Sequence, residues 1–339
     1  MPPDMEFTIT KSGRVAVIGY GSWATAIVKI LLETQPRVGW FIREKADLEY
    51  IAENHTNPYY LRDVHVDTAR LDMSDDVNEV VRDADIIILC VPSAYMKVHL
   101  EGLTVPLKEK FVVSAVKGII PGDYVTVAEY VNETYGVPFA RIGIVTGPCH
   151  AEEVALERLS YLTMVCKEES NARKLGEKFK TRYIGVSYSK DIYGAEYAAV
   201  LKNIYAIGVG IAVGLGYGDN FNAVLISAST AEMSRFIEHS FPGGRQITDS
   251  AYLGDLLVTC YSQFSRNRTF GAMIGKGYSV ESAQAEMRMV AEGYYGSEGI
   301  AKINEKQGVD MPIADAVYRI LYKGASPTTV MKELTLKLK

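Results

Sequence analysis

The chain has 339 residues, of which 48% are hydrophobic and 23% are charged, and its formal net charge is −5. This composition is that of an ordinary folded protein, and the length allows two domains. The net negative charge excludes a general attraction to nucleic acid or to anionic membranes, so an anionic ligand has to be held by locally placed basic groups.

The cysteines and the start of the chain indicate a cellular setting. The four cysteines form no CxxC pair, and Cys149 beside His150 does not have the spacing of metal ligands, so no metal site is expected. Residues 1–6 carry acid and proline where a signal peptide has a basic and then an apolar region. We therefore expect a reduced, cytoplasmic protein without a membrane span.

The first half of the chain alternates between strand and helix patterns. Helical patterns cover residues 24–32, 48–54 and 74–82. Short apolar runs typical of buried strands cover residues 13–19, 37–43, 85–91, 111–116, 141–145 and 162–166, with an edge strand at 183–186. This alternation predicts an α/β fold, namely a Rossmann-like, mostly parallel, doubly wound sheet.

The second half reads as helical. Residues 197–218 form a run about as long as a bilayer-spanning helix. The run contains Lys202, Asn203 and five glycines, and no basic cluster flanks it, so we interpret it as a buried core helix followed by a glycine-rich bend. Further helices are predicted at residues 222–239, 250–260, 279–290 and 314–321. The expected domains are residues 1–188, α/β, and residues 189–339, all-α.

A glycine-rich loop follows the first predicted strand and opens a helix. The segment Gly19-Tyr-Gly-Ser-Trp-Ala24 matches the dinucleotide fingerprint G-x-G-x-x-G/A in its required context. The first glycine permits the tight turn, the second lets the backbone approach a pyrophosphate, and free N–H groups at the helix start receive phosphate. The predicted cofactor contacts in this loop are Gly19, Gly21, Ser22, Trp23 and Ala24.

The end of the second strand bears on the choice of cofactor. NAD-binding domains usually carry an acid there for the ribose 2′-hydroxyl, whereas this strand ends in Arg43, followed by Glu44. An arginine accepts the 2′-phosphate of NADP, which slightly favours NADPH, while Glu44 keeps NAD open. The alternative interpretation is that Arg43 is a solvated strand end.

Lys202 is the only charged residue between Glu196 and Asp219. Burial of a lysine lowers its pKa, and a lowered pKa suits a catalytic proton donor. The alternatives are that its side chain reaches solvent past the helix surface or that it ends a buried face. Spacing alone does not decide between these interpretations.

Motifs along the whole chain resemble those of one family. In order they are Asn57-Pro-Tyr-Tyr-Leu61, Val91-Pro-Ser93, Val116-Lys-Gly118, Gly147-Pro-Cys-His-Ala-Glu-Glu-Val154, Leu201-Lys-Asn203, Leu253-Gly-Asp-Leu-Leu-Val-Thr-Cys260 and Ser265-Arg-Asn-Arg268. From about Gly13 to its end, the chain resembles the NAD(P)-dependent glycerol-3-phosphate dehydrogenases, especially the bacterial type. That resemblance implies reduction of dihydroxyacetone phosphate to sn-glycerol 3-phosphate, a precursor of phospholipids.

The resemblance also assigns roles to residues. It implies that Lys202 exchanges a proton with the substrate oxygen at C2, with Lys117 as a second lysine touching substrate and cofactor. The other implied substrate contacts are Gly147, Cys149, Asn203, Asp255, Thr259, Ser265, Arg266 and Asn267. The other implied cofactor contacts are Ala151, Arg266, Val290 and Glu292.

The implied chemistry is coherent, and two alternatives remain. Like charges on Lys117 and Lys202 depress each other's pKa, and Asp255 counters this effect. Other two-domain dehydrogenases, acting on hydroxy acids or ketopantoate, share a Rossmann domain and a catalytic lysine, but the Ser265-Arg-Asn267 segment favours a phosphorylated substrate. A non-catalytic nucleotide sensor is the other alternative, and retention of both lysines and Asp255 argues against it. The oligomeric state stays open, with a homodimer as one candidate.

Overall fold

The computed structural model describes residues 8–10, 12–287 and 289–338. The chain forms two compact units. The α/β unit consists of the residues up to Val91, Tyr95–Val116 and Val127–Ile192, and the helical unit consists of Pro92–Ala94, Lys117–Thr126 and the residues from Tyr193 onward. The helical unit therefore takes two short segments from the first half of the chain. The start of the chain, residues 1–6, lies outside the described residues.

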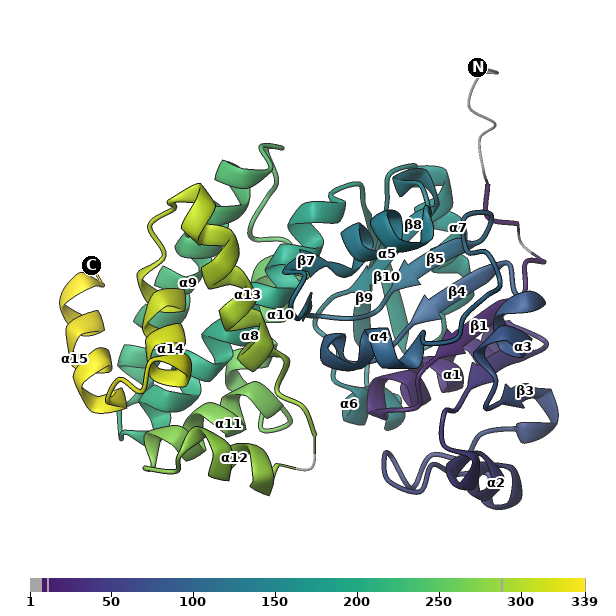
Figure 1. Ribbon diagram of the computed structural model, residues 1–339, viewed down its shortest axis with the longest axis horizontal. Coiled ribbons are helices and arrows are strands. Elements are labelled where there is room, and N and C mark those ends of the chain that lie inside the picture. Colours follow the sequence, from purple (N-terminus) through teal and green to yellow (C-terminus); the bar gives the residue numbers. More distant parts are fainter. Residues whose placement is uncertain (1–7, 11, 288, 339) are drawn as a thin grey trace. The chain divides into compact units, whose positions relative to one another are not determined.

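The α/β unit is built on one large sheet, shown in purple to teal in Figure 1. The described residues give it eight strands in the order β10-β9-β8-β5-β4-β1-β2-β3, all parallel to their neighbours except for the antiparallel pair β8–β9. The strands are β1 (Val15–Ile18), β2 (Val38–Phe41), β3 (Leu71–Ser74), β4 (Ile86–Leu89), β5 (Phe111–Ser114), β8 (Ile142–Thr146), β9 (Ser160–Cys166) and β10 (Ile184–Ser189). The predicted doubly wound, mostly parallel fold is confirmed, with β10 at an edge as predicted.

Helices cover this sheet, as the sequence alternation predicts. They are α1 (Ser22–Thr34), α2 (Lys45–Asn54), α3 (Val77–Arg82), α4 (Met96–His99), α5 (Val127–Tyr135), α6 (Ala151–Ala155) and α7 (Glu169–Phe179). Every residue of β1, β4 and β5 is buried, because strands of a parallel sheet are covered on both faces. Burying each of their large aliphatic side chains stabilises the fold by roughly 1.5–3 kcal/mol.

The fingerprint loop lies where the strand order reverses. From β1 the chain builds β2 and β3 toward one edge and then returns to place β4 on the other side of β1. In open α/β sheets, ligands bind at such a switch point, beyond the carboxyl ends of the strands. Gly19 follows β1 there with φ of +116°, and a Cβ atom at this position would lie 2.5 Å from the carbonyl oxygen of Cys90. The fold itself therefore requires glycine at position 19.

The helical unit, drawn mostly in teal to yellow in Figure 1, surrounds a long apolar helix. It contains α8 (Ile192–Gly214), α9 (Asp219–Ser240), α10 (Asp255–Tyr261), α11 (Arg266–Gly275), α12 (Val280–Glu286), α13 (Glu292–Gln307), α14 (Pro312–Tyr322) and α15 (Pro327–Lys337), and a small hairpin of β6 (Ile119–Ile120) and β7 (Val125–Thr126). Helix α8 is long and apolar enough to cross a membrane, but 89% of its most apolar stretch is buried. As predicted from Lys202, Asn203 and the glycines in this run, α8 is a buried core helix.

Glycines lock α8 against α11. An added Cβ would lie 2.1 Å from the carbonyl oxygen of Arg268 at Gly210, and 2.1 Å from that of Ile207 at Gly271. The backbones of the two helices therefore touch directly, and Gly210 and Gly214 of α8 serve this close packing. This contact fixes the start of α11 relative to the helix that carries Lys202.

Some sequence expectations differ from the structure. The helix predicted at 74–82 begins later, at Val77, because Ser74 ends strand β3. The edge strand β3 was not predicted, because Leu71 is its one fully buried residue and the run Leu-Asp-Met-Ser carries little apolar signal. The helix predicted at 279–290 ends earlier, at Glu286, because the backbone of Met287 is extended.

Candidate active site

Three charged side chains meet inside the helical unit. The Nζ atom of Lys202, on α8, lies 2.6 Å from Oδ1 of Asp255, and the Nζ atom of Lys117 lies 2.8 Å from Oδ2 of the same carboxylate. Only 6% of the Lys202 side chain and 1% of the Asp255 side chain are exposed, whereas 18% of Lys117 is exposed. One buried carboxylate thus joins two lysines that are far apart in the sequence.

This arrangement shifts the proton equilibria of the cluster. Burial lowers the pKa of Lys202, the charge of Asp255 raises it, and the charge of Lys117 lowers it again, which leaves the pKa of Lys202 at about 7. Burial raises the pKa of Asp255, but the two lysines outweigh burial and hold that pKa below its ordinary value. Near neutral pH, Asp255 is therefore ionised while Lys202 exists in both protonation states.

The backbone before Asp255 is unusual. A π-helical turn, Ser250–Gly254, runs directly into α10, whose first residue is Asp255. One turn later the Thr259 hydroxyl donates to the carbonyl oxygen of Asp255 at 2.6 Å and accepts from Nζ of Lys202 at 2.8 Å. Because its proton is committed to the backbone, the Thr259 oxygen is oriented as an acceptor for Lys202.

The backbone around Lys117 is held by side chains. Nδ2 of Asn203 donates to the carbonyl oxygen of Lys117 at 2.8 Å. Next to Gly118, which follows Lys117, the Glu292 carboxylate accepts from the N–H of Ser93 at 2.8 Å and from the Ser93 hydroxyl at 2.6 Å. A Cβ at Gly118 would lie 2.2 Å from Oε2 of Glu292 and 2.4 Å from Oγ of Ser93, so this pair packs directly against the backbone. Ser93 belongs to the motif Val91-Pro-Ser93, but the sequence did not predict a role for it.

The start of α11 carries the predicted phosphate-binding segment. Ser265 caps the helix by accepting from the Arg268 N–H, and Oδ1 of Asn267 accepts from the Gly293 N–H at 2.9 Å. Arg266 lies near enough to Glu292 to oppose the rise in the pKa of that carboxyl, a rise that burial causes. Val290 is half-buried and lies two residues before the start of α13. A ten-residue helix presents free N–H groups at its start, a site that suits an anion.

In the α/β unit, the fingerprint loop leaves room and donors for an anion. Gly21 is the N-cap of α1 and offers no side-chain cap, so the first N–H groups, at Ser22, Trp23 and Ala24, keep their donor capacity. The Trp23 indole Nε1 is buried without a hydrogen-bond partner among the described residues. An added Cβ at Gly21 would meet no atom within 4 Å. These features fit the pyrophosphate of a dinucleotide.

A second turn of the α/β unit carries Gly147, Cys149 and Ala151. Gly147 has φ of +120°, and a Cβ there would lie 2.6 Å from the carbonyl oxygen of Tyr161. The Cys149 thiol donates to that same carbonyl at 3.2 Å, and Ala151 begins α6. The turn is therefore folded onto β9, and the thiol is partly exposed.

Arg43 borders a cavity of about 360 Å³ in the α/β unit. Its guanidinium lies 3.8 Å from the Glu44 carboxylate and is 45% exposed. The other residues that line the cavity are Phe41, Asp75, Asp76, Val77, Asn78, Val98, His99, Glu101 and Gly102. The cavity thus offers one guanidinium for a phosphate and several carboxylates for ribose hydroxyls.

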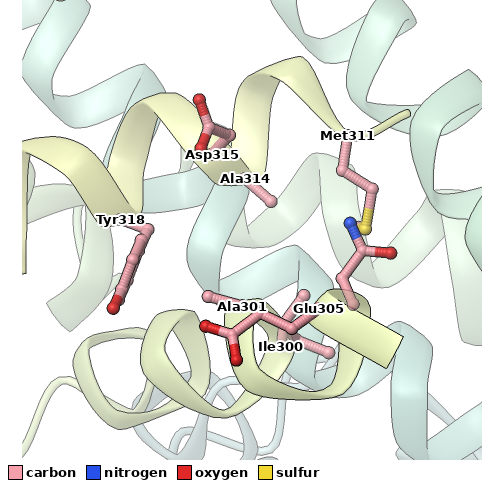
Figure 2. Close-up of a pocket in the computed structure, with 8 residues that line it drawn as sticks. Ile300, Ala301, Glu305, Met311, Ala314, Asp315 and Tyr318 are labelled. Atoms are coloured by element: carbon pink, nitrogen blue, oxygen red, sulfur yellow. The ribbon is translucent and has the colours of Figure 1, made fainter. Parts of the chain in front are cut away.

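A smaller cavity, of about 270 Å³, lies in the helical unit and contains none of the predicted site residues. Figure 2 shows its wall, in which residues of α13 face residues at the start of and along α14. The lining is Ile300, Ala301, Asn304, Glu305, Met311, Ala314, Asp315 and Tyr318.

A fingerprint loop at the switch point of a doubly wound sheet is typical of dinucleotide-dependent enzymes, and a buried lysine of near-neutral pKa suits a proton donor. Family models place the chain within this class. The model for the NAD-dependent glycerol-3-phosphate dehydrogenase N-terminus matches residues 14–172, and the model for its C-terminus matches residues 191–332. The chain belongs to the NAD-dependent glycerol-3-phosphate dehydrogenase family.

Individual relatives agree with this assignment. The chain is 35% identical over 323 residues to the glycerol-3-phosphate dehydrogenase [NAD(P)+] of an Exiguobacterium species, an alignment that covers 95% of this chain and 94% of that one. It is also 35% identical to the Thermotoga enzyme of the same name, with coverage of 95% and 96%. The crystal structure of Coxiella burnetii glycerol-3-phosphate dehydrogenase is similar, with a TM-score of 0.88, 26% identity and coverage of 96% and 99%. The protein is accordingly an oxidoreductase that uses NAD or NADP.

Proposed function

We propose that the protein reduces dihydroxyacetone phosphate to sn-glycerol 3-phosphate in the cytoplasm, where the product supplies glycerophospholipid synthesis. The buried Lys117–Asp255–Lys202 cluster carries this proposal. Carbonyl reduction needs a proton donor where negative charge develops, and a lysine of pKa about 7 is such a donor at neutral pH.

The central step is proton transfer from Lys202. The bound nicotinamide cofactor supplies the hydride that adds to C2 of the substrate. As charge grows on the C2 oxygen, the Lys202 ammonium donates a proton to it, and in the reverse direction neutral Lys202 takes that proton back. Asp255 and Thr259 hold Nζ of Lys202 by the contacts described above, so the donor is oriented before substrate binds.

The remaining residues of the helical unit bind substrate in this proposal. Lys117 contributes a second cation beside the reacting oxygen, and Asn203 holds the carbonyl of Lys117 in place. Ser265, Arg266 and Asn267 hold the substrate phosphate, because a helix start and a guanidinium together provide several donors to one anion.

The remaining contacts in this proposal are with the cofactor. The loop residues Gly19 to Ala24 hold the pyrophosphate, and Arg43 holds the 2′-phosphate of NADP. The other proposed contacts, with cofactor or with both cofactor and substrate, are Lys117, Gly147, Cys149, Ala151, Arg266, Val290 and Glu292. Both oxygens of Glu292 already accept from Ser93, so in this proposal the carboxylate contacts the cofactor through its remaining lone pairs.

A spectrophotometric assay tests the proposed reaction. The purified chain is mixed with dihydroxyacetone phosphate and NADPH or NADH, and the loss of nicotinamide absorbance is followed. We expect turnover with at least one cofactor, and formation of glycerol 3-phosphate. Turnover with a hydroxy-acid precursor or ketopantoate instead would favour the other dehydrogenase class, and binding without any turnover would favour a nucleotide sensor.

Replacing Arg43 with alanine tests the preference for NADPH. A charge-assisted contact with the 2′-phosphate is worth about 1.5–3 kcal/mol, so the dissociation constant of NADPH should rise by about 10- to 100-fold. NADH lacks that phosphate, and its dissociation constant should change little. Titration of both cofactors into both proteins measures this difference, and equal losses for the two cofactors would refute the role of Arg43.

For the assembly, we propose a homodimer as the state to test. Sedimentation velocity of the purified chain measures it directly, because a dimer has twice the 37.4 kDa mass of one chain. A single monomeric species at micromolar concentration would reject the homodimer.

A further inference from the structure

The first three carbonyl groups of the fingerprint loop, those of Gly19, Tyr20 and Gly21, each accept from a side-chain donor. Trp40 Nε1 donates to the carbonyl oxygen of Gly19 at 2.8 Å, Asn57 Nδ2 to that of Tyr20 at 2.7 Å, and Thr25 Oγ1 to that of Gly21 at 3.0 Å. In a trans peptide the C=O points opposite to the N–H of the following residue. Fixing these carbonyls therefore fixes the direction of the next N–H groups, which turn away from the three donors.

Asn57 is the member of this set that lies outside the β1–α1–β2 segment. Its side chain is buried, and its Nδ2 also donates to Thr25 Oγ1 at 3.0 Å. Its Oδ1 accepts from the N–H groups of Tyr59 and Tyr60, both at 3.0 Å. Two donors and two acceptor positions are all used, so the amide has one orientation that satisfies the network. Thr25 passes the chain of hydrogen bonds on to Gly21.

The first residues of the segment that begins at Asn57 hold this amide, whereas Leu61 packs against the apolar core. The Asn57 side chain closes a turn by accepting from the N–H groups of Tyr59 and Tyr60. Pro58, which lies between Asn57 and Tyr59, restricts the backbone of this turn. The Tyr59 side chain is 61% exposed, so it adds little to the core. The motif Asn57-Pro-Tyr-Tyr-Leu61 thus has a structural purpose that its sequence did not reveal, which is to present a buried amide to the loop after β1.

We propose that Asn57 is a positioning residue for cofactor binding. Through the carbonyl of Tyr20 and the hydroxyl of Thr25, it holds the peptide groups of the fingerprint loop in the orientation that receives the pyrophosphate. The open space beside Gly21 lies on the same loop. Preorganised donors bind an anion without a further ordering cost, so Asn57 strengthens dinucleotide binding without touching the dinucleotide. This inference rests on the proposed function, in which the fingerprint loop holds the pyrophosphate.

The test measures equilibrium binding of NADPH to the full-length chain by isothermal titration calorimetry, with the melting temperature of each cofactor-free protein alongside. Asn57→Ala should raise the dissociation constant about tenfold or more, the value of one to two hydrogen bonds of preorganisation. Thr25→Val, which removes the bridging hydroxyl, should also raise it, and Thr25→Ser, which keeps the hydroxyl, should restore wild-type affinity. The Thr25 pair keeps the test decisive if Asn57→Ala folds poorly.

Two further variants separate the outcomes. Asn171→Ala removes another buried asparagine of the α/β unit, whose Oδ1 accepts from the Ile9 N–H, and it should lower the melting temperature without changing NADPH affinity. Gly21→Val places a side chain where the backbone is in an ordinary conformation and no protein atom is near, so it should block the pyrophosphate in a folded protein. If Gly21→Val binds NADPH normally, the proposed cofactor site is wrong. If Gly21→Val loses binding while Asn57→Ala and Thr25→Val bind as the wild type does, the role of Asn57 is overturned.

Discussion

Replacing Lys202 with methionine should lower kcat for dihydroxyacetone phosphate reduction by about 10²- to 10⁴-fold, the usual contribution of a general acid. The fold should survive, because Asp255 keeps Lys117 at 2.8 Å and the methionine fills a site that is already buried. Removing a buried cation relieves its desolvation, so the melting temperature should stay equal or rise. Stopped-flow and steady-state assays, with a thermal melt of each protein, measure both effects.

A second buried lysine provides the control for this variant. Lys178 lies in the α/β unit, is also buried, and donates to the carbonyl oxygen of Gly13 at 3.0 Å and to Gln35 at 3.2 Å. Lys178→Met should leave kcat near the wild-type value, because Lys178 is not one of the three residues of the Lys117–Asp255–Lys202 cluster. Near-normal turnover by Lys202→Met would remove the proposed proton transfer.

The pH dependence gives an independent signature of the same group. Burial, opposed by Asp255 and reinforced by Lys117, places the pKa of Lys202 at about 7. Reduction uses the protonated lysine, so its kcat/KM should fall as the pH rises through 7, whereas oxidation of glycerol 3-phosphate should rise over that interval. Measurements are best confined to pH values above the second phosphate pKa of about 6, so that the substrate stays dianionic. Lys202→Met should lack this titration in both directions.

The same pKa shift makes a statement about stability. The folded pKa of Lys202 lies below its unfolded value of 10.5, so between about pH 7 and that value the unfolded chain binds more protons than the folded chain. The free energy of unfolding therefore rises with pH across that window. Below pH 7 the destabilisation that comes from burying protonated Lys202 is fully present. The stabilisation expected for Lys202→Met should accordingly be larger at pH 6 than at pH 9.

The sequence predicts the sheet well because parallel strands are buried on both faces. Runs such as Val15–Ile18 and Ile86–Leu89 are continuously apolar, which is a strong local signal. The strand Leu71–Ser74 was missed because its position at the sheet edge leaves most of it half-exposed. The close contact of α8 with α11 was also invisible, since glycine in a sequence does not reveal whether it serves a bend or a neighbour.

The candidate site was predictable in composition but not in geometry. The apolar surroundings of Lys202 left open whether its side chain is buried or reaches solvent, and the resemblance supplied Lys117 and Asp255. The pKa of Lys202, however, depends on contacts with residues far along the chain, such as Asp255, which is 53 positions away. Ser93 and Glu292 are 199 positions apart, and such a pair leaves no periodic pattern. Asn57 was assigned no role for the same reason, because its partners Tyr20 and Thr25 lie on another segment.

Replacing Asp255 with alanine should be the most damaging single change in the cluster. It leaves two lysines near each other without their shared anion, and breaking a buried ion pair in this way costs about 3–5 kcal/mol. Without the attraction of the carboxylate, the pKa of Lys202 should fall further, so the lysine would be neutral at pH 7 and kcat for reduction should drop as well. Urea unfolding at pH 7 measures the stability loss, and the pH profile of kcat/KM measures the shift.

The background of Lys202→Met separates the electrostatic cause from simple loss of packing. In the Lys202→Met background, removing Asp255 leaves only Lys117, which is partly exposed, without its anion. In the wild type the same change leaves both lysines without it, so Asp255→Ala should cost clearly less stability in the Lys202→Met background. The exposed pair of Arg37 and Asp72 supplies the comparison, since Asp72→Ala should have the same small effect in both backgrounds. An equal cost of Asp255→Ala in both backgrounds would show that Asp255 acts through packing alone. A smaller cost after removal of Lys202 would establish that the carboxylate is what makes two lysines tolerable in the interior of the helical unit.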